Sequence, residues 1–446
     1  MKLELEEIIK ATSAKVLKKD IETGKLNFST DTRSIQKGDI FVPIKGETFD
    51  GENFIENALN NGAEAYFTRN DKVFDNAKVV LQVKDTLIAY LECARLCRKN
   101  INPKVIGITG SSGKTTSKEM MYAIASEKFR THKTDKNHNN EIGFCQTMFN
   151  MPEDTEVLIV EMGMRGFGEI ELLSKYSEPD ISIITNAGTA HIGRLGSKEN
   201  IAKAKCEIVK FQNPNGTFVT EENPMVENII DFSGKKVFCS LKDVEFLEKT
   251  TDYTKFSYKG NNFEINVSGE YNVKDAIECI EAGFALGMDV KDIQAGLKKY
   301  KNIEKRFEEE IVNGFKIIND SYNANPDSMK GFVKNVVELY ENPVLVLGNM
   351  GELGENSAKY HAEIGEYINT LNKTNIIVLT VGNLAKEIHN AISNEINKKH
   401  FENTKDVSLY ILDNIDRRYT IFLKASRSEK FEDIIKYLKG DNLWLW

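Results

Sequence analysis

A short apolar run, a glycine-rich turn and a helical pattern follow one another from residue 105 to residue 129. The run Val105–Thr109 reads VIGIT, which is typical of a buried strand. Gly110, Ser111, Ser112 and Gly113 form the turn, and Lys114, Thr115 and Thr116 open the helical pattern. Backbone N–H groups at the start of a helix attract anions, and small residues let a phosphate come close to them. The order therefore predicts a phosphate-binding loop, with Lys114 at the terminal phosphates and the Thr115 hydroxyl on Mg²⁺.

The spacing of this loop differs from the common pattern G-x-x-x-x-G-K-[ST], because the residue five positions before Gly113 is Ile108. A chance glycine turn before a helix is the alternative. The strand before the turn and the helical pattern after it favour the phosphate loop.

Composition narrows the class of protein. A chain of 446 residues suggests about three domains. The net charge of −8 comes from acidic and basic residues mixed throughout, which argues against a broad nucleic-acid surface but leaves room for local basic pockets. The six cysteines are scattered and form no zinc-type set, so we expect reduced thiols and a cytoplasmic protein. The charged N-terminus is not a signal peptide, and no apolar run is long enough to span a membrane.

The pattern of strands and helices indicates an α/β protein with three domains. Residues 1–100 read as a small α/β domain, residues 101–310 as a central domain built on the phosphate loop, and residues 311–446 as a second doubly wound sheet. A hairpin is expected at Asn313-Gly314. Helices are expected over Ser197–Phe211 and Leu384–Ile396, and the apolar tail Leu443–Trp446 is interpreted as packing against the domain.

In the N-terminal domain, polar and aromatic residues flank two short apolar runs between residues 28 and 51. Thr32, Arg33, Lys45, Phe49 and Asp50 could together bind a phosphorylated ligand that carries an aromatic group. The alternative is ordinary turn chemistry on a solvated face, and on physical grounds alone the sequence favours that alternative.

Two central strands are followed by residues with metal-binding chemistry. Glu161 ends the strand that begins at Glu156, and His191 lies in the loop after the strand Ile181–Thr185. Ligands bind at the carboxyl ends of such strands, where an acid can hold Mg²⁺. A lone histidine is more often structural, but its position parallel to Glu161 favours a functional role. Asn140 lies in the polar run between Thr134 and Gly143, whose amides are either turn residues or ligands of a phosphate or a metal-bound water.

Seven motifs, in chain order, resemble the signatures of the Mur ligase family. They are ITGSSGKTTSKEM, NHNNEIG, EMGMRGFGEI, ITNAGTAHIGRLGS, DSYNANPDSM, GNMGELGENS and KASRS. The resemblance extends from about Thr30 to Leu438. It implies a nucleotide-sugar-binding N-terminal domain, a central ATPase domain and a Rossmann-like C-terminal domain. It also implies an ATP-dependent amide ligase that joins D-alanyl-D-alanine to UDP-N-acetylmuramoyl-tripeptide, acting as a monomer with no nucleic-acid partner.

The resemblance assigns roles to residues that match the family motifs. The implied catalytic residues are Lys114, Glu161, His191 and Lys205. The implied ligands of two Mg²⁺ ions are Thr115, Glu161, His191 and Lys205. Lys205 matches a lysine that family members carbamylate, although the residue alone would pass for a surface lysine. The implied ATP site comprises Gly110, Ser111, Ser112, Gly113, Lys114, Thr115, Thr116, Asn140, Asn272, Arg306 and Asp320. The implied substrate site comprises Thr32, Arg33, Lys45, Phe49, Asp50, Asn53, Asn323, Asn325, Lys424, Ser426 and Arg427.

The chain departs from the family motifs at four places. Ala425 replaces a glycine, Tyr271 replaces a histidine before Asn272, Glu52 replaces a histidine after Asp50-Gly51, and Asn349 stands where aspartate is common. Other readings are a Mur-type ligase with a different amino acid, a folylpolyglutamate-type relative, a small-molecule kinase and a silent paralogue that only binds. A kinase would need only the phosphate loop and no amine substrate.

Overall fold

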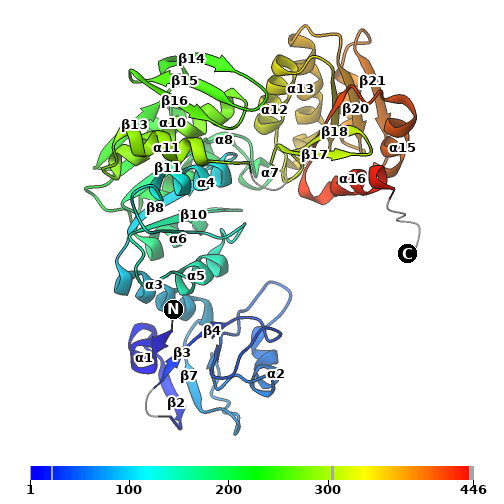
Figure 1. The fold of residues 1–446 in the computed structure, drawn as a ribbon. Helices are drawn as coiled ribbons and strands as arrows, with labels where there is room; N and C mark the ends of the chain where they lie inside the picture. The colour runs from blue at the N-terminus through cyan, green and yellow to red at the C-terminus, as the bar shows by residue number, and fades with distance from the viewer. Residues whose placement is uncertain (1, 22–23, 303–305, 441–446) are drawn as a thin grey trace. The chain divides into compact units, whose positions relative to one another are not determined.

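The computed structural model describes residues 2–21, 24–302 and 306–440 (Figure 1). The chain divides into two compact units, one of residues 1–107, 129–182 and 208–216, the other of residues 108–128, 183–207 and 217–446. The expected domain boundaries near residues 100 and 310 stay a prediction. The tail Leu443–Trp446 lies outside the described residues. Within the described part of the chain, no helix combines the length and the apolar character needed to cross a membrane.

The N-terminal region contains a five-stranded sheet of order β2-β7-β6-β5-β4, in which β2 is antiparallel to β7 and the other pairs are parallel. A two-stranded sheet pairs β1 with β3. The elements are β1 Leu3–Glu4, α1 Leu5–Thr12, β2 Lys15–Lys19, β3 Lys25–Leu26, β4 Phe28–Ser29, β5 Ile40–Phe41, the 3₁₀ helix η1 Gly51–Phe54, α2 Ile55–Asn60, β6 Ala65–Thr68, β7 Val79–Gln82 and α3 Thr86–Ile101. The core includes Phe41, Ile55 and Tyr66.

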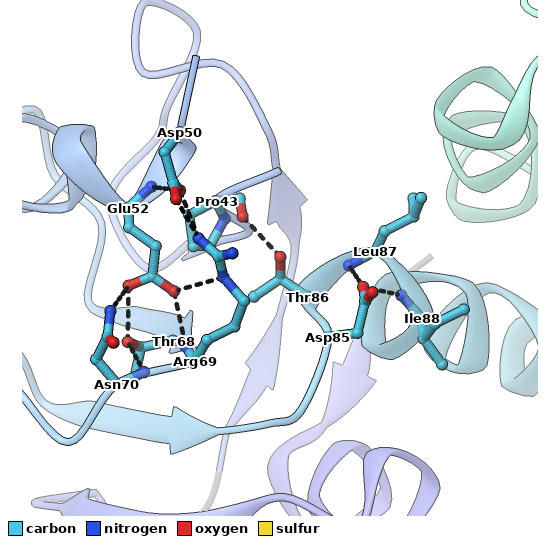
Figure 2. Close-up of polar contacts among 10 residues, drawn as sticks. All are labelled: Pro43, Asp50, Glu52, Thr68, Arg69, Asn70, Asp85, Thr86, Leu87 and Ile88. Carbon is cyan, nitrogen blue, oxygen red and sulfur yellow. Dashed lines mark hydrogen bonds and ion pairs between the residues drawn. The ribbon is translucent and has the colours of Figure 1, made fainter. Parts of the chain in front are cut away.

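Helix α3 shows how local sequence fixes an element. The Asp85 carboxylate caps its first turn by accepting from the backbone N–H groups of Leu87 and Ile88 at 2.8 and 3.0 Å (Figure 2). The Thr86 hydroxyl donates to the Pro43 carbonyl at 2.7 Å, which ties the helix start to the loop after β5. Asn102 ends the helix in the left-handed conformation with φ of 55°.

The central region contains a six-stranded sheet of order β13-β12-β11-β8-β10-β9. Its strands are β8 Lys104–Thr109, β9 Thr131–Lys133, β10 Val157–Glu161, β11 Ile181–Ile184, β12 Thr217–Glu221 and β13 Lys235–Cys239. The helices are α4 Lys114–Ala125, α5 Glu141–Phe149, α6 Glu169–Ser177, α7 Ile192–Leu195, α8 Lys198–Cys206, α9 Pro224–Ile229, α10 Glu270–Ala285 and α11 Val290–Lys299. A separate three-stranded antiparallel sheet joins β14 Val244–Lys249, β15 Thr254–Tyr258 and β16 Asn261–Ile265.

The C-terminal region contains a sheet of order β17-β18-β22-β19-β20-β21, which is parallel except for the β17–β18 hairpin. Its strands are β17 Glu308–Val312, β18 Phe315–Asn319, β19 Pro343–Gly348, β20 Ile377–Val381, β21 Asn397–Phe401 and β22 Thr420–Lys424. Its helices are α12 Pro326–Leu339, α13 Ser357–Thr370, α14 Ala385–Ala391, α15 Thr404–Asn414 and α16 Glu432–Lys439. The expected hairpin turn is confirmed, because Asn313 and Gly314 both have positive φ, 48° and 82°.

Two expected helices end earlier than the sequence pattern indicated. The helix expected over Ser197–Phe211 is α8, which ends at Cys206 and continues as a short 3₁₀ turn to Val209. The hydroxyl of buried Ser174 donates to the Ile208 carbonyl and accepts from the Phe211 N–H. Because these two backbone groups bond to Ser174, they do not continue the hydrogen-bond pattern of the helix.

The helix expected over Leu384–Ile396 is α14, which ends at Ala391. The Lys398 ammonium donates to the carbonyls of His389 and Ile392 at its end. Strand β21 and helix α15 were not expected. Strand β21 lies at the sheet edge, where its partly polar residues Asn397-Lys-Lys-His-Phe401 give no apolar run.

Close helix packing gives a test of the fold. A Cβ at Gly296 in α11 would lie 2.4 Å from the Ile124 Cα in α4, whereas a Cβ at Gly331 in α12 would meet Tyr271 at an ordinary 3.7 Å. Gly296→Ala should therefore lower the free energy of unfolding by about 1–3 kcal/mol. Gly331→Ala, also inside a helix, should be neutral or stabilising by up to about 1 kcal/mol. Urea unfolding followed by circular dichroism measures both, and equal effects would contradict this packing.

Candidate active site

The phosphate loop joins β8 to α4 and has no room for larger side chains. Gly113 has φ of 81°, and a Cβ there would lie 2.5 Å from the Asp275 carboxylate in α10. A Cβ at Gly110 would lie 1.8 Å from the Thr185 hydroxyl. Both glycines are therefore required by close approach, and the loop backbone stays uncovered by side chains of its own at these points. This is the cradle that a phosphate group needs.

The loop after β11 holds the phosphate loop in place. The Asn186 side-chain oxygen accepts from the N–H groups of Ser111 and Ser112 at 3.1 and 3.0 Å. The Asn186 amide donates to the Ser112 carbonyl and hydroxyl, and the Thr185 hydroxyl donates to the same carbonyl at 2.5 Å. One asparagine thus bridges four polar groups, which fixes the loop before any ligand binds.

Two cations predicted at the ATP phosphates lie at this loop. The Lys114 ammonium donates to the Gly110 carbonyl at 2.8 Å. The Arg306 guanidinium donates to the Thr115 hydroxyl at 3.0 Å and lies over the Tyr322 ring at 4.4 Å. Thr116 follows in the first turn of α4. The structure therefore places Lys114, Thr115 and Arg306 at the phosphate loop, and their roles toward ATP stay a prediction.

Lys205 is fully buried in α8, which is not the surface position that the residue alone suggested. Burial, together with the nearby Lys114 charge, lowers the pKa of the Lys205 amine well below its usual value. A lowered pKa favours the neutral, nucleophilic amine.

His191 has a positive φ of 63° and precedes the short helix α7. Its Nδ1 lies 2.5 Å from the Glu352 carboxylate in the loop after β19. The Thr189 N–H and hydroxyl donate to the Asp327 carboxylate at 2.7 and 2.6 Å, and Asp327 belongs to the first turn of α12. The loop that carries His191 is therefore fixed by two acids from the C-terminal sequence motifs.

Glu161 ends β10 and is buried. The Asn139 amide donates to its Oε1 at 2.9 Å, and the Thr134 hydroxyl accepts from its N–H. Asn140 instead caps α5 by accepting from the Gly143 N–H at 2.9 Å, so it is Asn139 that orients the acid. Glu161 belongs to one compact unit, whereas Thr115, His191 and Lys205 belong to the other. In residues 2–21, 24–302 and 306–440 no group of three or more His, Cys, Asp or Glu side chains gathers as a metal site, and the predicted metal set stays a prediction.

The residues predicted for the ribose and peptide ends largely lie together. Lys424 is buried, and its ammonium contacts the Asp320 carboxylate at 2.6 Å and the Asn323 carbonyl at 3.3 Å. Asn325 caps α12 through the Ser328 N–H, and its amide lies 3.5 Å from the Ser111 carbonyl. Ser426 accepts from the Gly351 N–H at 2.6 Å. One member lies otherwise, because Arg427 is exposed and pairs with Glu432. Asn272, predicted to contact the adenine, donates its side-chain amide to the Ser268 carbonyl.

The predicted N-terminal residues do not form one contact network. Arg33 is exposed and pairs with Asp31 two residues away, which also lowers the pKa of that acid to about 2. Lys45, Phe49 and Asp50 lie on a separate hairpin, and Asn53 is exposed in η1. Among the described residues, no hydrogen bond or ion pair joins Thr32 or Arg33 to that hairpin.

Comparison with known proteins identifies the family. Family models match residues 27–104 (Mur ligase family, catalytic domain), residues 108–283 (Mur ligase middle domain) and residues 305–427 (Mur ligase, glutamate ligase domain). A relative from Bacillus subtilis, named UDP-N-acetylmuramoyl-tripeptide–D-alanyl-D-alanine ligase, is 36% identical over 425 residues and covers 92% of each chain. The chain belongs to the Mur ligase family.

Two solved structures agree with this assignment. A crystal structure of MurF from Acinetobacter baumannii superposes with a TM-score of 0.90 at 26% identity, covering 99% of both chains. A MurF ligase from Thermotoga maritima in complex with ADP has a TM-score of 0.81 at 26% identity, covering 93% of this chain and 97% of the other. The expected three-domain α/β architecture of a Mur ligase is confirmed.

The structure explains how this Mur ligase accommodates three of its four motif departures. Asn349 donates to the Glu429 carboxylate at 2.9 Å, where an aspartate would repel it. Ala425 is buried next to Gly348, where a Cβ would lie 2.7 Å from the Ala425 Cβ. Glu52 accepts four hydrogen bonds from residues 68–70, which a histidine could not do.

Sequence reasoning missed four residues of the site, which are Asn139, Asn186, Asp275 and Asp327. Asn186 and Asp327 stand inside quoted motifs, so their position was a usable signal. No sequence signal pointed to Asp275, because this residue reaches the site only when helix α10 packs against Gly113.

Asp275 gives a pH-dependent test of the site. Burial raises its pKa to about 7 against the smaller opposing effect of the Lys274 charge, and Glu221 and Arg306 add still smaller effects that raise and lower it. An acid whose pKa is raised on folding destabilises the folded state increasingly as pH rises from its unfolded value of 3.8 to about 7. Asp275→Asn removes this penalty. The variant's gain in unfolding free energy over wild type should therefore grow between pH 4 and about 7 and then level off, by on the order of a few kcal/mol. Urea unfolding at a series of pH values measures it, and a pH-independent difference would contradict the buried acid.

Proposed function

We propose that the protein is an ADP-forming ligase that joins D-alanyl-D-alanine to UDP-N-acetylmuramoyl-tripeptide. The observation that carries the proposal is the 36% identity, over 92% of both chains, to a relative of that name. A phosphate loop braced by Asn186, beside residues of the C-terminal motifs, supports it. The product is UDP-muramoyl-pentapeptide, a precursor for peptidoglycan synthesis.

The first step activates a poor electrophile. The terminal carboxylate of the tripeptide attacks the γ-phosphorus of ATP, the bond to the β-phosphate oxygen breaks, and ADP leaves. Lys114 and Arg306 offset negative charge on the transferred oxygens, and the loop backbone positions them. Bound Mg²⁺, held by Thr115, Glu161, His191 and the carbamate of Lys205, would supply further neutralisation of that charge.

The second step forms the amide. The amine of D-alanyl-D-alanine attacks the acyl phosphate carbon, the tetrahedral intermediate collapses, and phosphate leaves as the ammonium proton is lost. Lys424 and Ser426 would orient the peptide ends, because the Lys424 ammonium is already held by Asp320 and the Ser426 hydroxyl by Gly351. Asn272 would contact the adenine and Asp320 the ribose.

Carbamylation of Lys205 has a physical basis in this chain. Only a neutral amine reacts with CO₂, and the buried Lys205 has a lowered pKa. The resulting carbamate is an anion that would be attracted to Lys114, whereas a protonated Lys205 would be repelled by it.

Two further expectations belong to this proposal. We expect the protein to act as a monomer. We also expect it to act in the cytoplasm, which agrees with the free state of its six cysteines. A small-molecule kinase is the alternative that a phosphate loop alone allows, and the amine-substrate requirement separates the two.

Phosphate release tests the reaction. ATP, Mg²⁺ and UDP-muramoyl tripeptide, with and without D-alanyl-D-alanine, are incubated with the protein. Release should depend on both the tripeptide and the dipeptide, and mass spectrometry should find the UDP-pentapeptide. Turnover that is indifferent to the dipeptide would overturn the ligase proposal and favour a kinase or another amine substrate.

Lys205 variants test the carbamate. Lys205→Ala should lower kcat by about 100-fold because the anion that would help hold Mg²⁺ is lost, and Lys205→Glu, which keeps a carboxylate there, should retain more activity than the alanine variant. Added bicarbonate should stimulate bicarbonate-depleted wild type and leave Lys205→Glu unchanged. Lys203→Ala, a control on the exposed face of α8, should behave as wild type. A wild type that is insensitive to bicarbonate would contradict the carbamate.

A further inference from the structure

A small hairpin in the N-terminal region presents an aromatic ring and a cation to solvent. Backbone hydrogen bonds join Gly51 to Ile44 at 3.0 Å and Gly46 to Phe49 at 2.9 Å. Phe49 is 57% exposed, yet its ring lies directly on Gly46, where a Cβ would come within 2.5 Å of it. Lys45 at the same hairpin is exposed. The ring is thus held against the backbone while one face stays open.

The base of this hairpin is held by an ion pair. The Arg69 Nη2 donates to both Asp50 carboxylate oxygens at 2.5 and 2.6 Å (Figure 2). The Glu52 N–H also donates to Asp50 at 3.0 Å. These bonds, led by Arg69, lower the pKa of Asp50. The Asp50 carboxylate is therefore occupied by the protein itself, so its predicted contact with substrate is better read as support of the hairpin.

Glu52 holds Arg69 in turn. Its carboxylate accepts from the Thr68 hydroxyl at 2.8 Å, the Arg69 N–H at 2.6 Å and the Asn70 amide at 3.1 Å (Figure 2). The Glu52 side chain is 10% exposed. All of these donors lie at or after the end of β6, so Glu52 and Arg69 connect the hairpin to the sheet.

We propose that Arg69 and Glu52 are positioning residues that set the affinity of the protein for the nucleotide part of its UDP-sugar substrate. The inference rests on the proposed function. The Phe49 ring offers a stacking surface for a base, and Lys45 offers a cation for the diphosphate. Because Arg69 pairs with Asp50, the Asp50 carboxylate competes less for the positive charge of Lys45 when an anion approaches. A hairpin fixed before binding loses little conformational entropy when the nucleotide binds.

The ion pair of this network lies near the surface of its domain, since the Arg69 and Asp50 side chains are 24% and 34% exposed. Loss of the ion pair should therefore release the hairpin more than it unfolds the domain. That difference separates a positioning role from a merely structural one.

The experiment compares Arg69→Met and Arg69→Lys with wild type. Arg69→Met leaves Asp50 and Glu52 as neighbouring carboxylates, so the KM for UDP-muramoyl tripeptide and the Kd for UDP by calorimetry should each rise about tenfold or more. The KM values for ATP and D-alanyl-D-alanine, and kcat at saturation, should change by less than about twofold. Arg69→Lys keeps a cation without the bidentate geometry and should be intermediate. The control Arg418→Met removes a similar Arg–Asp pair in the C-terminal region and should change none of these values.

The outcomes separate this inference from the proposed reaction. An unchanged Kd for UDP in Arg69→Met would overturn the inference, as would a parallel rise of all three KM values with a lower melting temperature. Failure of wild type to bind UDP would overturn it as well. A wild type that binds UDP but forms no pentapeptide would overturn the proposed reaction, while the Kd comparison would still decide the role of Arg69.

Discussion

The active-site half of this chain depends on one tight contact, between the phosphate loop and the elements packed against it. Asp275 of α10 lies against Gly113, Thr185 lies against Gly110, and Asn186 bonds the serines between them. The loop backbone is therefore fixed from outside rather than by its own side chains. A larger residue at either glycine would push apart α10 or the loop after β11, which carry the predicted adenine contact Asn272 and metal ligand His191.

A second theme is the pairing of charges away from water. Lys424 is buried but contacts Asp320, and Glu52 is nearly buried but accepts four hydrogen bonds. Lys205 and Asp275 instead carry shifted pKa values: burial and the Lys114 charge lower that of Lys205, and burial outweighs the Lys274 charge to raise that of Asp275. Burial of Lys205 and Asp275 therefore lowers the free energy of unfolding of the protein without ligands. Such residues are typical of functional sites, where a bound ligand or a modification supplies the missing partner.

The fold was largely predictable from the sequence, and each exception has a specific physical cause. The strand–turn–helix order around Gly113 and the Asn313-Gly314 hairpin follow from glycine chemistry, which is local. Strand β21 was missed because an edge strand needs only one apolar face, and the early end of α8 depends on Ser174, which is remote in sequence. The set of site residues was named by motif. Asn139, Asn186 and Asp327 stand inside those motifs, but their roles emerged only from their contacts.

The sequence by itself determined the phosphate loop, the α/β class and the family, because these depend on short-range spacing and on motifs that lie contiguous in the chain. The tertiary structure alone decided that Lys205 is buried, that Asp275 touches Gly113 and that Arg69 occupies Asp50. Burial and ion pairing join residues that are far apart in sequence, so no local pattern reports them. From the sequence alone, these charged residues would be interpreted as surface residues. Only the packed structure shows that water is excluded from around them.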